Sequence, residues 1–491
     1  ASLLKSWKDT TASENLYVRI GRWNVPGRPV AVLVDFQPYF AMKNDIYTRL
    51  WEDYGVDSLH AYGDYDEASM FSYAAGLVVE SYYNHVLKGQ CEHVVYQAHE
   101  WMTGLGALYI QKHVPEVATI FTTHATTIGR SIAGNHKPLY EYLFAYNGNQ
   151  MAQELNVQSK HSIERETAHH VDCFTTVSEV TNRECAELLD KPADVVLMNG
   201  FEKDFVPSKA LFARKRREAR RKLREVAGAL LGTEFDDDVM IISTSGRYEF
   251  RNKGIDLYME AMNRSLRNKD LTRKILAFVQ VPGWVCCPRE DLKERLDSGK
   301  ACDTPLQWPL LTHWLHEMSH DQVIDYMKRY NMWNQPEDKV KVIFVPCYLD
   351  GADGIFNMHY YDLLIGMDLT VYASYYEPWG YTPLESVAFH VPCVTTNLSG
   401  FGLWVNQLLG KEGELADGVQ VVRRTDYNSS EVADAIKDAI TAYSAFTPHE
   451  VENIRHKAAD ISEHALWKHF IQYYYQAYDF ALHKAKQRRG R

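Results

Sequence analysis

Short apolar segments alternate with stretches of helical periodicity along most of the chain. The apolar segments are four to seven residues long and end in Gly, Ser, Asn or Pro. Between them, apolar residues recur with the spacing of one helix face. This alternation is typical of parallel strands covered by helices on both faces, because such strands are buried from both sides. The pattern therefore predicts an α/β fold.

The predicted strands form two sets, which favours two large α/β domains in a chain of 491 residues. The first set comprises residues 29–35, 93–97, 118–122, 173–177 and 195–198. The second set comprises residues 240–244, 275–279, 341–345, 369–372, 393–396 and 419–422. We expect each of these strands to be buried on both faces of a parallel sheet.

Three further segments complete the predicted organisation. The basic segment 209–224 repeats apolar residues at helical spacing, so an amphipathic helix with a solvated basic face is favoured over a nucleic-acid site. Residues 284–336 lack a strand pattern, which predicts a helical insertion. Aromatic residues mark one face of a long helix at the C-terminal end. The predicted boundaries are 1–207, 208–464 with the insertion, and 465–491 for the terminal helix.

The composition excludes several functional classes. With 53 Lys+Arg and 64 Asp+Glu the net charge is −11, which disfavours binding to nucleic acid or to an anionic membrane surface. No segment reaches the roughly 18 consecutive apolar residues of a membrane span. The eight cysteines contain no Cys-x-x-Cys, so they indicate neither a disulfide framework nor a zinc site. We expect a cytoplasmic protein.

The most informative segment, residues 374–385, directly follows a strand of the second set. Pro378 restricts Glu377 to an extended conformation at the end of that strand. Thr382 is the predicted N-cap of the next helix, with Pro383 in its first position and Glu385 completing a capping box.

The same helix start predicts an anion site. Its first amides belong to Gly380, Tyr381 and Thr382, and amides at a helix N-terminus bind phosphate well. A carboxylate and a phosphate site would then lie side by side, where open α/β sheets bind ligands. An isolated Glu pair at this spacing would more often be a helix cap and a turn residue.

A second candidate loop, residues 246–254, joins a strand to the predicted helix 255–262. It carries Arg247 and Lys253, a cation pair that suits a diphosphate. Such a pair would offset the charge of a leaving nucleoside diphosphate without a metal ion. Exposed Arg and Lys more commonly pair with surface acids.

Polar side chains also follow three strands of the first set. His99 and Glu100 come after one strand, His124 and Arg130 after the next, and Asn199 after the last. The carboxyl ends of parallel strands meet at one sheet edge, so a neutral donor and a cation are expected to face a ligand there.

Taken in order, these segments resemble the animal and fungal type of glycogen synthase and its bacterial relatives over nearly the whole chain. The most specific matches are residues 122–130, 174–178, 246–254, 374–385 and 397–402. The resemblance implies a GT-B fold, with two Rossmann-like domains facing across a cleft and the terminal helix returning to the first. It also implies retaining, metal-independent transfer of glucose from UDP-glucose to a non-reducing end of an α-1,4-glucan, with no cofactor.

The resemblance also implies residue roles. Glu377 would bond the donor glucose, Glu385 the ribose, and Arg247 and Lys253 the diphosphate. His124 and Arg130 would approach from the other domain. The implied catalytic residues are Glu377, Arg247, Lys253 and His124, and the substrate-binding residues are Arg130, Glu385, Gly380, Tyr381, Thr382, His99, Glu100 and Asn199.

Two alternative functions stay open. The family's Lys-x-Gly-Gly segment has no counterpart in the first 60 residues, which keeps open a catalytically silent homologue that binds nucleotide sugar or glucan. The motifs contact phosphate, ribose and hexose more than the base, so ADP-glucose or another donor also fits them. The expected partners are a nucleotide sugar and glycogen, and a homo-oligomer is left open.

Regulation is expected to differ from that of eukaryotic relatives. They carry an arginine-dense helix that senses glucose 6-phosphate, whereas residues 445–457 here contain one Arg. We therefore expect an enzyme without that response. The basic run 484–491 is expected to be a frayed tail.

Overall fold

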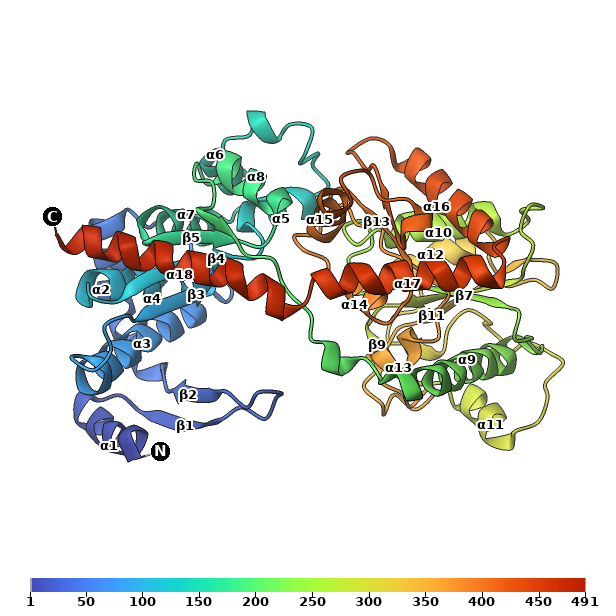
Figure 1. The fold of residues 1–491 in the computed structure, drawn as a ribbon, viewed down its shortest axis with the longest axis horizontal. Coiled ribbons are helices and arrows are strands. Elements are labelled where there is room, and N and C mark those ends of the chain that lie inside the picture. The colour runs from blue at the N-terminus through green and yellow to red at the C-terminus, as the bar shows by residue number, and fades with distance from the viewer. Residues whose placement is uncertain (1, 491) are drawn as a thin grey trace. The chain divides into compact units, whose positions relative to one another are not determined.

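The computed structural model describes residues 2–490 and contains two compact units (Figure 1). The N-terminal unit comprises the chain up to Met198 together with the segment from Phe470 onward. The C-terminal unit comprises Asn199–His469. Among residues 2–490, none of the helices has both the length and the apolar character that crossing a membrane requires.

A parallel four-stranded sheet with the strand order β3-β4-β5-β6 forms the centre of the N-terminal unit. Its strands are β3 (Val95–His99), β4 (Ala118–Thr123), β5 (Cys173–Thr176) and β6 (Val195–Val196). The helices are α1 (Ser2–Thr11), α2 (Lys43–Tyr54), α3 (Tyr65–Tyr82), α4 (Gly104–His113), α5 (Thr127–Gly134), α6 (Gly148–Glu154), α7 (Gln158–His170) and α8 (Glu179–Leu188). The C-terminal helix α18 (Trp467–Arg489) runs along this sheet, and its Ala477, Ala481 and Ala485 pack on Ile120, Cys173 and Leu197.

The strand predicted at residues 29–35 forms, but its predicted burial is wrong. It is β2 (Val30–Val34), which pairs antiparallel with β1 (Val18–Arg22) in a separate two-stranded sheet. Val30 and Leu33 are 50% and 57% exposed. The segment is apolar enough for a core strand, but the preceding strand β1 adjoins it as a hairpin, and a short hairpin connection gives an antiparallel pair.

A six-stranded parallel sheet forms the centre of the C-terminal unit, in the order β11-β8-β7-β12-β13-β14. These strands are β7 (Met240–Ser245), β8 (Ile275–Gln280), β11 (Val340–Val345), β12 (Leu369–Val371), β13 (Cys393–Thr396) and β14 (Val419–Val422). All residues of β7, β8 and β11 are buried, which confirms that helices cover both faces. The helices are α9 (Lys209–Leu231), α10 (Ile255–Ser265), α11 (Glu290–Ser298), α12 (Gln322–Arg329), α13 (Tyr360–Leu364), α14 (Tyr381–Ala388), α15 (Gly400–Leu409), α16 (Ser429–Ser444) and α17 (Pro448–His464).

The segment 284–336 is not wholly helical, so that prediction is corrected. Besides α11 and α12 it contains β9 (Val285–Pro288) and β10 (His313–Leu315), which pair antiparallel. The side chain of Arg289 is fully buried and donates to the backbone carbonyls of Gln307, Trp308 and Leu311. A buried guanidinium with several acceptors fixes this segment, and no periodic apolar pattern announces such an arrangement.

Two predictions about basic segments also need correction. In α9, Arg216 and Arg220 each donate to the buried carboxylate of Asp368 at 2.8 Å, so part of its basic face is not solvated. Near the C-terminal end, Arg488 bonds both carboxylate oxygens of Asp172, at 3.0 and 2.9 Å. A bidentate guanidinium on a buried carboxylate holds that helix end in place, so it is not a frayed tail.

Candidate functional site

Lys253 and Glu377 form a nearly buried ion pair in the C-terminal unit. The distance between Lys253 Nζ and Glu377 Oε2 is 2.7 Å, and the two side chains are 11% and 15% exposed. Glu377 lies on a parallel bridge to Ser399 after β12. Gly254, which caps α10 at φ 72°, brings the lysine loop close, because a Cβ there would lie 2.1 Å from the carbonyl oxygen of Ala373.

The helix after Glu377 begins earlier than predicted. Helix α14 starts at Tyr381 with Gly380 as its N-cap, so Thr382 is not the cap, and Pro383 is the third helical residue. Gly380 has φ 109°, a conformation that glycine adopts without a Cβ penalty, and this permits the earlier turn.

The helix start still gathers the amides expected there. The first N–H groups of a helix have no intrahelical acceptor, and Pro383 has no N–H. The amides at this end therefore belong to Gly380, Tyr381 and Thr382, beside the Lys253–Glu377 pair. An ideal Cβ on Gly380 would lie 3.4 Å from Cγ of Glu377, which shows how close the two positions are.

Glu385 does not form the predicted capping box. Its carboxylate accepts a hydrogen bond of 2.8 Å from the hydroxyl of Tyr361. Burial raises the pKa of Glu385 to about 7. Arg247 is 59% exposed and pairs with Glu249 at 3.0 Å, so its guanidinium lies at the surface of this unit.

The N-terminal unit brings together His99, Glu100, His124 and Arg130 at the carboxyl ends of β3 and β4. The ring atoms His99 Nδ1 and His124 Nε2 are 3.0 Å apart, and Glu100 Oε1 accepts from the backbone N–H of His124 at 2.9 Å. Burial lowers the pKa of His99 and lowers that of His124 to about 4. Burial raises the pKa of Glu100, and the charge of Arg130 acts against that rise. The histidines are therefore neutral at neutral pH.

Two buried carboxyl groups that the sequence analysis missed support this group. Glu164 on α7 accepts from the hydroxyl of Thr123 at 2.5 Å and from the backbone N–H of Thr127 at 2.8 Å. Glu184 on α8 accepts from the hydroxyl of Thr126 at 2.9 Å. Burial, and secondly the charge of Glu100, raises the pKa of Glu164 to about 8. A carboxyl inside a helix pattern gives no sequence signal for such a role.

The predicted residues thus fall into two groups, one in each unit. Lys253, Glu377 and the start of α14 belong to the C-terminal unit, with Glu385 and Arg247 on the same segments. The histidines, Glu100 and Arg130 belong to the N-terminal unit. Asn199, 5% exposed, is the first residue of the C-terminal unit and follows β6.

Comparisons of sequence give one consistent family. A family model described as glycogen synthase matches residues 2–287 and 290–489. Glycogen [starch] synthase of Neurospora crassa is 26% identical over 98% of this chain and 76% of its own length. The liver glycogen [starch] synthase of Rattus norvegicus is 26% identical over 97% of this chain and 74% of its own.

Comparisons of structure give the fold. The α,α-trehalose 6-phosphate synthase of Burkholderia multivorans superposes with a TM-score of 0.54 at 10% identity, over 97% of this chain and 88% of that one. The catalytic domain of starch synthase IV from Arabidopsis thaliana gives 0.51 at 13% identity, over 86% and 78%. Both are GT-B glycosyltransferases, and at this identity the likeness shows that the present chain has the GT-B fold.

Proposed function

This chain belongs to the glycogen synthase family, and we propose that it transfers glucose from UDP-glucose to the non-reducing end of an α-1,4-glucan with retention of configuration. The observation that carries the proposal is the ion pair of Lys253 and Glu377 beside the amides of α14. A carboxylate for sugar hydroxyls, a cation and a helix N-terminus for phosphate together match the two ends of a nucleotide sugar.

The proposed chemistry is mainly electrostatic. The bond between glucose C1 and the diphosphate breaks while C1 bonds the incoming 4-hydroxyl on the same face, and the proton of that hydroxyl passes to a phosphate oxygen of the leaving UDP. Lys253, Arg247 and the amides of α14 would stabilise the negative charge that develops on the diphosphate. Lys253 has three donors, so its bond to Glu377 leaves two for phosphate.

Glu377 and the N-terminal unit would act on the sugar. The Glu377 carboxylate accepts hydrogen bonds from glucose hydroxyls and holds Lys253 in place. Neutral His124 would donate to the sugar, and Arg130 would add a cation for phosphate. Glu385 would accept from the ribose, with Tyr361 holding its carboxylate. The eight cysteines are free thiols, which supports a reducing, cytoplasmic setting.

The direct test compares donors in the presence of glycogen. We expect kcat/KM for UDP-glucose to exceed that for ADP-glucose by at least about tenfold, a difference of about 1.4 kcal/mol in transition-state binding. The first product, followed by NMR, is expected to carry an α-1,4 linkage. Binding of UDP-glucose and glycogen without release of UDP would instead identify a silent homologue, and faster use of ADP-glucose would reassign the donor.

Transfer is expected to persist in excess EDTA, within about twofold of the untreated rate. Lys253 and Arg247 supply the cationic charge that a metal ion would otherwise provide at the diphosphate. The adjacent acids Asp236–Asp238 precede β7, and Asp237 and Asp238 are 92% and 82% exposed and pair with Arg224 and Arg273. Loss of the rate in EDTA and its return with Mg²⁺ or Mn²⁺ would contradict this prediction.

A further inference from the structure

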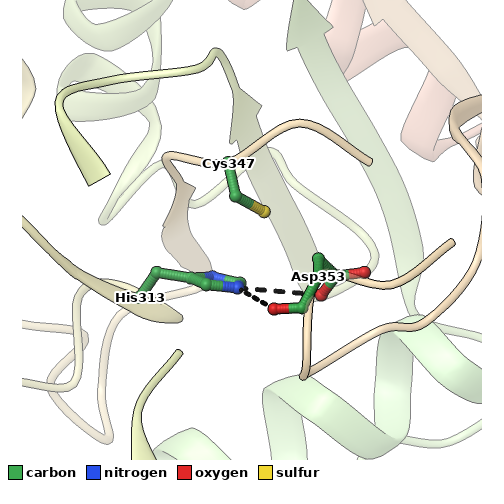
Figure 2. A group of neighbouring side chains, drawn as sticks. All are labelled: His313, Cys347 and Asp353. Carbon is green, nitrogen blue, oxygen red and sulfur yellow. Dashed lines mark hydrogen bonds and ion pairs between the residues drawn. The ribbon is translucent and has the colours of Figure 1, made fainter. Parts of the chain in front are cut away.

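His313, Cys347 and Asp353 converge in the C-terminal unit, and none of them is among the residues assigned to the donor (Figure 2). Three segments bring them together: His313 lies on β10, Cys347 follows β11, and Asp353 is in the loop before α13. The imidazole and carboxylate side chains are 2% and 0% exposed, and Cys347 is 7% exposed. Figure 2 shows the sulfur of Cys347 directed toward the other two side chains.

The spacing of the three side chains suits one small cation. Their ligand atoms all lie within 4.8 Å of one another, and His313 Nε2 is 3.7 Å from Asp353 Oδ1. Zinc binds nitrogen, sulfur and oxygen at about 2.0–2.3 Å in a tetrahedron, which places its ligand atoms roughly 3.3–3.8 Å apart. A rotation of the Cys347 side chain would bring its sulfur to that spacing from the other two ligand atoms.

The surroundings already orient two of the ligands. Asp353 accepts three backbone N–H bonds, two on Oδ1 from Ile355 and Phe356 and one on Oδ2 from Asn357. Oδ1, the oxygen 3.7 Å from His313 Nε2, thus accepts two bonds and Oδ2 accepts one, so Oδ2 retains the greater acceptor capacity for an ion. His313 Nδ1 is 2.8 Å from the hydroxyl of Thr312, and such a second bond on the far ring nitrogen fixes the ring of a metal-ligating histidine.

Thr312 also allows the imidazole to change its tautomer. With no ion bound, the Nε2–H donates to the carbonyl of Asp353 at 2.9 Å while the Thr312 hydroxyl donates to Nδ1. With an ion bound, Nδ1–H donates to the Thr312 oxygen and Nε2 offers its lone pair. Both states keep Nδ1 hydrogen-bonded, so ion binding costs no bond on that side of the ring.

We infer that His313, Cys347 and Asp353 bind a divalent cation of the zinc class. A thiolate, an imidazole and a carboxylate together select a borderline ion over Mg²⁺ or Ca²⁺, which prefer oxygen ligands alone. On binding, the thiol of Cys347 loses its proton to solvent and the sulfur bonds the ion. Water or the carbonyl oxygen of Asp353 would fill the fourth position.

The consequence of binding is structural. The ion would join β10, the end of β11 and the loop that leads to α13. In α13, the hydroxyl of Tyr360 bonds that of Ser245 at 2.6 Å, at the end of β7 where the Arg247 loop begins. The ion would therefore stabilise the base of the donor loop, and its loss is expected to lower the unfolding temperature more than the rate.

The experiment uses Co²⁺ and Zn²⁺ on the full chain after chelation and dialysis. Added Co²⁺ is expected to give a thiolate-to-cobalt charge-transfer band that saturates at about one ion per chain, a readout that does not depend on activity. Zn²⁺ is expected to displace the band and to raise the unfolding temperature by at least about 3 °C.

Two variants assign the band to this site. Cys347→Ser is expected to abolish the band and the Zn²⁺ shift while unfolding, in EDTA, within about 2 °C of the parent. The matched control replaces the exposed, adjacent Cys286 and Cys287 by Ser and is expected to retain both effects. If Cys347→Ser unfolds early, His313→Gln, which keeps the thiol, is expected to weaken Co²⁺ binding at least tenfold. The inference is overturned if the parent shows neither effect, or if only the Cys286/Cys287 variant loses the band.

Discussion

The candidate groups in the two units differ in electrostatic character, one being an ion pair and the other being made mainly of neutral side chains. In the C-terminal unit, Lys253 and Glu377 form an ion pair at 2.7 Å, beside a helix N-terminus. In the N-terminal unit, burial lowers the pKa values of His99 and His124 and raises that of Glu100, so these three side chains tend toward neutrality. A charged surface suits a diphosphate, whereas neutral donors suit sugar hydroxyls, which must bind without competing salt bridges.

The strongest test of the group in the C-terminal unit is a double-mutant cycle on the ion pair of Lys253 and Glu377. Glu377→Gln is expected to lower turnover by at least about a hundredfold, because a contact to the transition state is lost. Lys253→Met is expected to do the same. If both side chains contact the donor, the double variant remains as slow as the slower single variant.

The cycle also separates catalysis from packing. Each single variant leaves one nearly buried charge without its partner charge, whereas the double variant leaves no charge there, only a neutral amide at position 377. Should the double variant recover to within a few-fold of the parent, the pair would be a structural salt bridge, and the site assignment would be wrong. The free energy of unfolding, measured on all four proteins, provides the control for folding.

The group in the N-terminal unit is tested through Glu164, a positioning residue. Its pKa of about 8 in the fold exceeds the ordinary value of 4.5, so the folded protein keeps a proton that the unfolded chain releases between these values. The stability that the protonated group contributes is therefore complete below about pH 4.5 and is lost as the pH rises through about 8.

Glu164→Gln removes this titration and keeps the bonds, since an amide can donate to Thr123 and accept from Thr127. Between about pH 5 and pH 8 we expect the free energy of unfolding to fall less in the variant, by on the order of 3 kcal/mol. Glu166→Gln, on the same helix, is the matched control. The free energy of unfolding is obtained from denaturant titrations at each pH. An equal pH dependence of this free energy in the parent and in Glu164→Gln would contradict the prediction.

The sequence predicts one part of the candidate site but not the other. The charged group was predictable because Lys253 and Glu377 each follow a strand within one short loop, so strand positions alone place them at the same sheet edge. Glu164 and the His313–Cys347–Asp353 group were not, because they depend on contacts between distant segments. The start of α14 was misplaced by two residues, since the φ of Gly380 is set by tertiary packing.

A smaller effect is expected when His124 is replaced. Its pKa of about 4 means that the ring is neutral through the physiological range, so it would donate as an imidazole. His124→Asn is expected to lower kcat/KM about tenfold, the cost of one or two weakened hydrogen bonds. The ratio of parent to variant should stay constant from about pH 6 to 8.5. A ratio that grows several-fold toward pH 6 would show that an imidazolium acts instead.

The smallest expected effect is the response to glucose 6-phosphate. Arg216 and Arg220 already bind Asp368, and burial, together with the charge of Arg216, lowers the pKa of nearby Arg455 to about 9. A dianion would have to displace a buried carboxylate to use these guanidiniums, which offsets its gain. At sub-saturating UDP-glucose we therefore expect the ligand to change the rate by less than about twofold. A rise on the order of tenfold, the scale of a coupling of about 1–3 kcal/mol, would contradict this expectation, and its loss in Arg455→Gln would then place the effector at this cluster.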